Sequence, residues 1–223
     1  MFASQRLRTV AGPIVPSGVI ISPNGQGAPN SVSNGALTFP NNVGAGNAVI
    51  ALIGGEPYGG TWSFGATFGG TALQQGPRLN SAALYYKTGL AGGTKVLNAW
   101  SSDSNLGAVP GGYGWYGAAI EVAGVVGNAI TGVATALGVN TLTLTAKHSG
   151  DLMVFAIFDY VSGLAFTGTP ATGLGGTPWV TSPASSTGQL VAMVAPTTGA
   201  TVTASWTGTF GGGNQGVLGM VIA

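Results

Sequence analysis

Residues 92–100 read GGTKVLNAW, and residues 198–206 read TGATVTASW. In an extended chain, Lys95, Leu97 and Ala99 would point to one side and the residues between them to the other. The glycines that open each stretch supply the turn that a β-hairpin needs. Both stretches are therefore predicted to be the second strands of β-hairpins.

The two stretches belong to a longer repeat. Trp100 and Trp206 are 206 − 100 = 106 residues apart, and the apolar segments that open at Gly46 and Gly150 are 150 − 46 = 104 residues apart. The recurring segments are residues 46–54, 84–100 and 117–124 in the first half and residues 150–158, 190–206 and 216–223 in the second. A repeat of about 105 residues is too long for a solenoid. It indicates an internal duplication, with halves at residues 46–124 and 150–223.

The predicted fold is all-β: a jelly-roll-like sandwich of two antiparallel sheets, in which the two halves share one core. Branched and aromatic residues between glycine-rich turns favour strands. A linker between independent domains would lie near residues 124–150, but NTLTLTAK at residues 140–147 is itself strand-like. We therefore expect one domain over residues 36–223, with Trp100 and Trp206 in its core.

Residues 1–35 are expected to form an extended N-terminal arm outside this sandwich. Five of the twelve prolines lie in residues 1–46, and proline fixes φ and opposes helix formation. The apolar residues of the arm are too few to form a core, so we expect them to bury against a neighbouring subunit. They are Val10, Ile14, Val15, Val19, Ile20 and Ile21.

The charge of the chain narrows the classes of partner. Charged residues make up only 5% of the sequence and the formal net charge is +1, whereas nucleic-acid binding uses clustered lysine and arginine. Nucleic acid is therefore not an expected partner. The apolar stretches are shorter than the roughly 18–20 residues that a membrane-spanning helix needs, so no span is predicted. Few charges also give little repulsion between molecules, which favours a subunit of an assembly.

Catalytic, metal and cofactor sites are not predicted. His148 and Asp151 lie in a sequence typical of a turn, and no G-x-S-x-G nucleophile motif accompanies them. A glycosidase needs two carboxylates that face each other, which Glu121 and Asp159 could provide only from adjacent strands. The carboxylates of the whole chain are Glu56, Asp103, Glu121, Asp151 and Asp159. Without cysteine there is neither a disulfide nor a thiolate metal site.

The candidate binding site is GGYGWYGA at residues 111–118. Tyr113, Trp115 and Tyr116 stand among glycines, and such aromatic residues stack on sugars or pack into protein interfaces. The alternative is that Trp115 and Tyr116 begin the next strand and enter the core.

Three segments carry a resemblance to a known group of proteins: GNAVIALIG at residues 46–54, LYYKTGLAGGTKV at residues 84–96 and GDLMVFAI at residues 150–157. With the charge-poor composition, they resemble the glycine-rich β-sandwich minor tail and surface proteins of bacteriophages that infect actinobacteria. The resemblance covers residues 36–223 and includes no catalytic residues.

This resemblance implies a virion structural protein: a minor tail, tail-tip or decoration subunit on the phage particle. Its expected partners are other virion proteins and further copies of itself, with a trimer favoured, and it implies contact with the host surface and its glycans. The alternatives are a carbohydrate-binding module and, after that, a glycan-degrading enzyme, because β-sandwiches support all three functions.

Overall fold

The computed structural model describes residues 16–26, 32–39, 41–55, 62–103, 114–123, 125, 127–158, 165–166, 180–181, 188–207 and 216–223. Over these residues the regular structure consists of β-strands without a helix, and each strand pair is antiparallel. The all-β prediction is confirmed. Within the same residues, no helix is long and apolar enough to cross a membrane.

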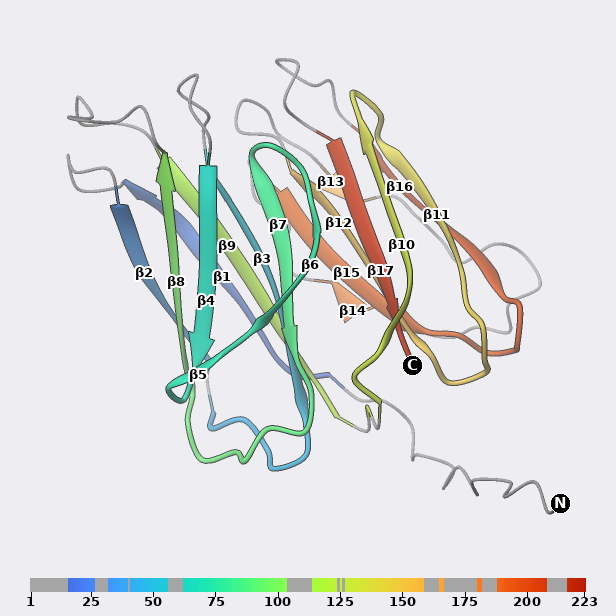
Figure 1. Ribbon diagram of the computed structural model, residues 1–223, viewed down its shortest axis with the longest axis horizontal. Coiled ribbons are helices and arrows are strands. Elements are labelled where there is room, and N and C mark those ends of the chain that lie inside the picture. The colour runs from blue at the N-terminus through green and yellow to red at the C-terminus, as the bar shows by residue number, and fades with distance from the viewer. Residues whose placement is uncertain are drawn as a thin grey trace, which may run out of the picture.

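The first half of the chain forms two sheets (Figure 1). Its strands are β1 (Pro16–Gln26), β2 (Val32–Thr38), β3 (Ala48–Gly55), β4 (Trp62–Phe68), β5 (Thr71–Ala72), β6 (Gln74–Arg78), β7 (Ala82–Lys87), β8 (Val96–Asp103) and β9 (Gly114–Val122). The order β1-β9-β3-β7-β6 makes inner sheet 1, and the order β2-β8-β4-β5 makes outer sheet 1.

The second half forms another two sheets. Its strands are β10 (Ile130–Leu137), β11 (Thr141–Thr145), β12 (Leu152–Phe158), β13 (Ala165–Phe166), β14 (Val180–Thr181), β15 (Gly188–Val194), β16 (Thr201–Thr207) and β17 (Gly216–Ile222). Inner sheet 2 has the order β10-β17-β12-β15-β14, and outer sheet 2 has the order β11-β16-β13. Four strands of the first half therefore have a counterpart at the matching place in a sheet of the second half. The counterparts are β3 and β12, β7 and β15, β8 and β16, and β9 and β17.

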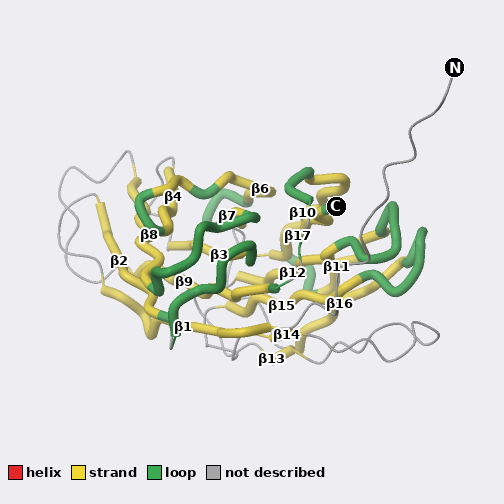
Figure 2. The backbone as a smooth tube through the Cα atoms, turned by 90° about the horizontal axis from the view of Figure 1, so that it is seen from below, coloured by secondary structure: helices red, strands yellow, loops and turns green. Residues whose placement is uncertain are grey.

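The four sheets lie in layers, with the two inner sheets in the middle (Figures 1 and 2). A central core between the inner sheets contains Leu52 and Leu84 from the first half and Val154 and Phe158 from the second. Each half also has its own core between its inner and outer sheets, with Leu97 in the first and Trp206 in the second. Across the central core the strand order is reversed, because β6 contacts β10 and β17 while β9 contacts β15.

The expectation of two sheets around one shared core is therefore wrong. The reason is visible in β3 and β12, which are buried at every position. A strand buried on both faces needs a packing layer on each side, and it reads as a continuous apolar run. Alternation between exposed and buried residues occurs instead in outer strands such as β11, whose three threonines are exposed and two leucines buried.

The expected arm is also corrected over residues 16–26, which form β1 in inner sheet 1. Val19, Ile20 and Ile21 pair through their backbone with Ile120, Ala119 and Ala118 of β9. Proline is tolerated at the first residue of a strand and at irregular positions. Accordingly, Pro16 opens β1, and Pro23 lies within the register shift between Ser22 and Gly25.

Of the remaining residues of the expected arm, some lie in a sheet and others lie outside the described residues. Residues 32–35 belong to β2. Val10, Ile14 and Val15 lie outside the described residues.

The structure describes the side chain of one of the two repeated tryptophans, Trp206. Trp206 is 2% exposed, and its Nε1 donates a hydrogen bond to Oε1 of Gln189 at 3.0 Å, which confirms its predicted burial. The side chain of Trp100 lies outside the described residues. The buried residues of β8 and β16 match at a spacing of 105, as Leu97 does with Val202 (202 − 97 = 105).

Candidate functional site

The two buried carboxylates that the structure describes each hold a turn. Oε1 of Glu121, on β9, accepts hydrogen bonds from the Gly44 backbone N–H at 2.8 Å and from Asn47 Nδ2 at 2.5 Å. Oδ2 of Asp151 accepts from the backbone N–H groups of Lys147 and His148, at 3.0 and 2.9 Å. Charge-assisted bonds of this kind are stronger than neutral ones. Both acids therefore fix the backbone in front of an inner strand.

His148 and Asp151 lie close to each other in the structure. His148 Nδ1 is 3.4 Å from Asp151 Oδ1, but the histidine side chain is half exposed while the carboxylate is buried. Both residues belong to the turn that precedes β12, which agrees with the predicted turn. Over the residues that the structure describes, no group of three or more histidine, aspartate or glutamate side chains could hold a metal ion.

The remaining candidates fall wholly or partly outside the described residues. Tyr113, Glu56 and Asp159 lie outside them entirely. The backbone of Trp115 and Tyr116 lies in β9, where Trp115 pairs with Gly55 and Tyr116 with Gly54. Of their side chains, and of that of Asp103, the structure describes nothing.

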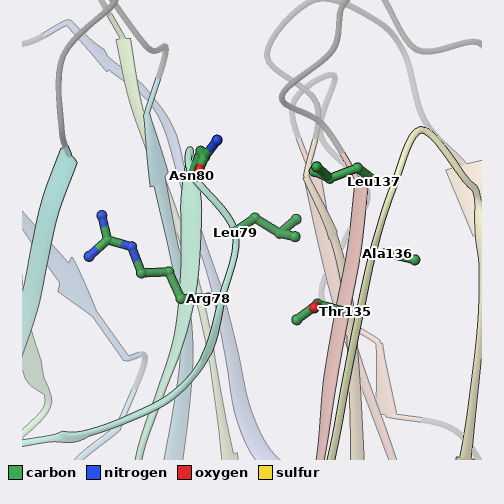
Figure 3. A pocket seen from close by; sticks show the side chains of 6 residues that line it. All are labelled: Arg78, Leu79, Asn80, Thr135, Ala136 and Leu137. Carbon is green, nitrogen blue, oxygen red and sulfur yellow. The ribbon is translucent and has the colours of Figure 1, made fainter.

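A groove lies where the two halves meet at β6 and β10 (Figure 3). Its volume is about 510 Å³, and its lining consists of Arg78, Leu79, Asn80, Thr135, Ala136 and Leu137. Leu79, Thr135 and Leu137 point toward one another across the gap, whereas Arg78 and Ala136 point away from it. The Arg78 guanidinium instead lies 5.4 Å from the centre of the Phe64 ring. The groove thus has a mixed lining, in which Leu79, Ala136 and Leu137 are apolar and Arg78, Asn80 and Thr135 are polar.

Exposed apolar side chains lie beside this groove. Among the described residues, the large hydrophobic side chains that are exposed are Val133 at 61%, Leu137 at 51% and Val139 at 40%. Two of them lie on β10 and the third in the turn that follows it. The alternate residues Ala134 and Ala136 pack against the core of the second half. One face of β10 is therefore anchored, and the other is open toward β6.

β10 is also the edge of inner sheet 2. In the described part of the chain it pairs with β17 and has no strand on its other side. Proteins protect such edges with proline, charge, bulges or short length. β6 has Pro77, Arg78 and a register shift, and β14 has only two residues. By contrast, β10 has eight residues with neither proline nor charge, and it is the longest described edge strand of that kind.

No role was predicted for residues 130–137 from the sequence, although a signal was present. In ITGVATAL, apolar residues occupy both alternating sets of positions, and no charged residue interrupts them. Such a strand is expected in the middle of a sheet or between two layers. Its position at an edge could not be read without the strand order.

No protein-family model, curated protein or solved structure matches this chain. Among the described residues, the exposed side chains of β10 and the groove beside them form the candidate interaction surface.

Proposed function

We propose that this chain is a structural subunit that acts through protein–protein assembly, in the manner of the phage tail and surface proteins that its sequence resembles. The observation that carries the proposal is the edge at β10, which is eight residues long, contains neither proline nor charge, and is regular from Gly132 to Leu137. Val133 and Leu137 expose about half or more of their surface there, on a chain in which only 5% of residues are charged. Exposed apolar patches with adjoining grooves mark sites of interaction.

The energetics favour a protein partner for this edge. Burying apolar surface contributes roughly 25 cal/mol per Å², and an added strand would also satisfy the backbone N–H and C=O groups along β10. A small polar ligand would bury little of the apolar surface of Val133 and Leu137 and could bond only a few of these backbone groups. The low charge further reduces repulsion between associating subunits.

We also infer that the two halves arose by duplication of one jelly-roll-like sandwich. Support comes from the matching order of the inner sheets, β1-β9-β3-β7-β6 and β10-β17-β12-β15-β14. The repeated segments in the sequence supply the strands at the corresponding places. A subunit of two joined sandwiches suits a rigid structural element, because the central core fixes one half against the other.

The test is the location of the chain. Because it contains no cysteine, Thr197→Cys in the exposed turn before β16 introduces a single thiol for a gold label. We expect labelled protein to occupy a fixed position on phage particles assembled with it, as seen by electron microscopy. Unlabelled particles, together with binding on a glycan array, would contradict the proposal and favour a carbohydrate-binding module. Release of sugar products would favour a glycan-degrading enzyme.

A further inference from the structure

We propose that β10 pairs antiparallel with β10 of a second copy of this chain, which joins the two copies of inner sheet 2 into one continuous sheet. The inference rests on the proposed function, since it names the surface through which the subunit assembles. It also specifies a two-fold dimer, in contrast to the trimer that the sequence resemblance implies.

The backbone of β10 is suited to receive a strand. From Gly132 to Leu137 its register with β17 is regular, and its one register shift lies before Gly132. A regular strand presents an even row of N–H and C=O groups on its open side, and strand addition uses such a row. β6, on the same side of the stacked inner sheets (Figure 2), is interrupted by a register shift between Gln75 and Arg78.

The side chains of β10 are complementary to themselves. An antiparallel pair centred on Thr135 sets Thr135 opposite the partner's Thr135, Val133 opposite the partner's Leu137, and Ala134 opposite the partner's Ala136. Directly opposed side chains on one face lie within contact distance. The two exposed apolar residues of each copy thus cover those of the other, and the pairing is closed under two-fold symmetry.

The opposed threonines have a precedent within this molecule. On outer sheet 2 the hydroxyls of Thr143 and Thr203 lie 2.8 Å apart, and those of Thr145 and Thr201 lie 3.0 Å apart. Cross-strand threonine pairs of this type stabilise antiparallel strands. The same pairing at Thr135 would satisfy both hydroxyls at the symmetry axis.

A second copy fits the edge better than an unrelated partner because of charge and continuity. Self-pairing sets identical side chains close together, which like charges would oppose, and β10 has none. The open face of β10 also continues an existing apolar interface. Ile130 of the same strand packs against the central core, and Leu137 borders the groove that Leu79 lines. The partner's Val133, set against Leu137, would extend that interface over the groove.

The experiment is a charge exchange at position 135, followed by sedimentation velocity. The unchanged chain, of 21.8 kDa, is expected to sediment as a dimer. Thr135→Lys and Thr135→Glu, each alone, are expected to raise the dimer dissociation constant roughly tenfold or more, because like charges then face each other at the axis. An equal mixture of the two variants is expected to regain the dimer. Thr141→Lys, at an exposed threonine of β11, is the matched control and is expected to leave the dimer intact.

Several outcomes would overturn the inference: an unchanged chain that stays monomeric, a trimer, or a dimer that both single variants retain. Recovery in the mixture excludes misfolding as the reason for lost association. Failure of the mixture to associate, with both variants folded by circular dichroism, would also overturn the proposed register. A chain that is monomeric in solution but present in particles would refute β10 pairing while the proposed assembly role stands.

Discussion

The two halves share an order of strands but differ where they touch. Gly54 lies one residue before the end of β3, and Phe158, at the matching position of the second half (158 − 54 = 104), is the last residue of β12. A Cβ added at Gly54 would collide with the Phe158 ring. The glycine of one half therefore makes room for the aromatic ring of the other. The two halves are therefore complementary at this contact. Two identical halves, with glycine or phenylalanine at both positions, would not be.

The turns before the inner strands differ in the same way. In the first half the carboxylate that binds the turn comes from Glu121 on β9, and Asn47 donates to it. In the second half Asp151 occupies the place of Asn47 (151 − 47 = 104) and binds the turn itself. The requirement for an acceptor facing these N–H groups is common to both halves, but the residue that meets it is not.

The edge strands of the two inner sheets differ in how well they are protected against the addition of another strand. β1 and β10 are the first strands of their sheets, yet β1 contains Pro16 and Pro23 and two register shifts. β10 contains no proline and a single shift. One half is thus protected against strand addition and the other is open, so association should be directed to one side of the molecule.

The largest effect is expected at Trp206. Trp206→Ala removes a fully buried indole and should lower the free energy of unfolding by about 3–5 kcal/mol. Because the central core couples the halves, we expect one transition in chemical denaturation, also for Leu97→Ala in the first half. Two separate transitions would show that the halves are independent. Trp206→Phe, which keeps a ring but loses the bond to Gln189, is the control and should cost less.

The contact between the halves is tested directly by Gly54→Ala. The added methyl group meets the Phe158 ring, and overpacking of this kind costs about 1–3 kcal/mol. Phe158→Leu in the same chain should recover part of that loss, giving a coupling energy in a double-mutant cycle measured by denaturation. Strictly additive costs would mean that the two positions do not meet.

The two turn carboxylates should act locally and separately. Glu121→Ala leaves the Gly44 N–H and the Asn47 amide without their acceptor, and Asp151→Ala leaves the N–H groups of the 147–148 turn without theirs, each at a cost of about 1–3 kcal/mol. Hydrogen exchange should quicken near Gly44 in the first variant and near His148 in the second. Faster exchange in both turns from either change would indicate that the halves are linked through these acids.

The smallest effect is expected at Tyr85, whose counterpart in the second half is Val191 (191 − 85 = 106). Its hydroxyl donates to the Phe64 carbonyl at 2.5 Å, and burial raises the pKa of Tyr85 to about 12, against a partial lowering by Arg78. Tyr85→Phe should cost about 1 kcal/mol near neutral pH, from the lost hydrogen bond.

The raised pKa also gives a dependence on pH. Stability from neutral Tyr85 is complete below pH 10 and is lost as the pH rises toward about 12, because the unfolded chain releases this proton first. The difference between the wild type and Tyr85→Phe should therefore shrink across that interval in denaturation curves. Burial raises the pKa of Tyr86 as well, so Tyr86→Phe is the companion variant. A constant difference up to pH 12 would contradict the assignment to Tyr85.

The sequence predicted the strands better than it predicted their layers. Local alternation and glycine turns predicted strands within residues 84–100 and 190–206, and β7, β8, β15 and β16 are such strands. The prediction that they form hairpins is wrong, because β7 and β15 lie in the inner sheets whereas β8 and β16 lie in the outer sheets, so each glycine turn connects two layers. The number of sheets depends on which apolar strands are covered on both faces. An apolar run such as residues 152–158 has the same sequence pattern whether it lies in one deep core or between two separate cores. Only the pairing partners, far away in sequence, decide between these arrangements.

The candidate surface was hidden from the sequence for a related reason. Val133 and Leu137 look like core residues, and their exposure follows from the place of β10 at the end of a sheet order. β1 was missed because its prolines argue against a strand. They are tolerated because they coincide with the strand start and with an irregular register.

The pairing of β1 with β9 has a consequence for how the chain is made. Ile20 lies beside Ala119, which is 119 − 20 = 99 residues later in synthesis. At a translation rate of 5–20 residues per second, β1 leaves the ribosome roughly 5–20 s before its partner. During that interval its apolar residues have no β9 to pair with, and closing so long a loop is slow. The prolines of β1 then protect the nascent chain as well, because they limit pairing with other chains before β9 arrives.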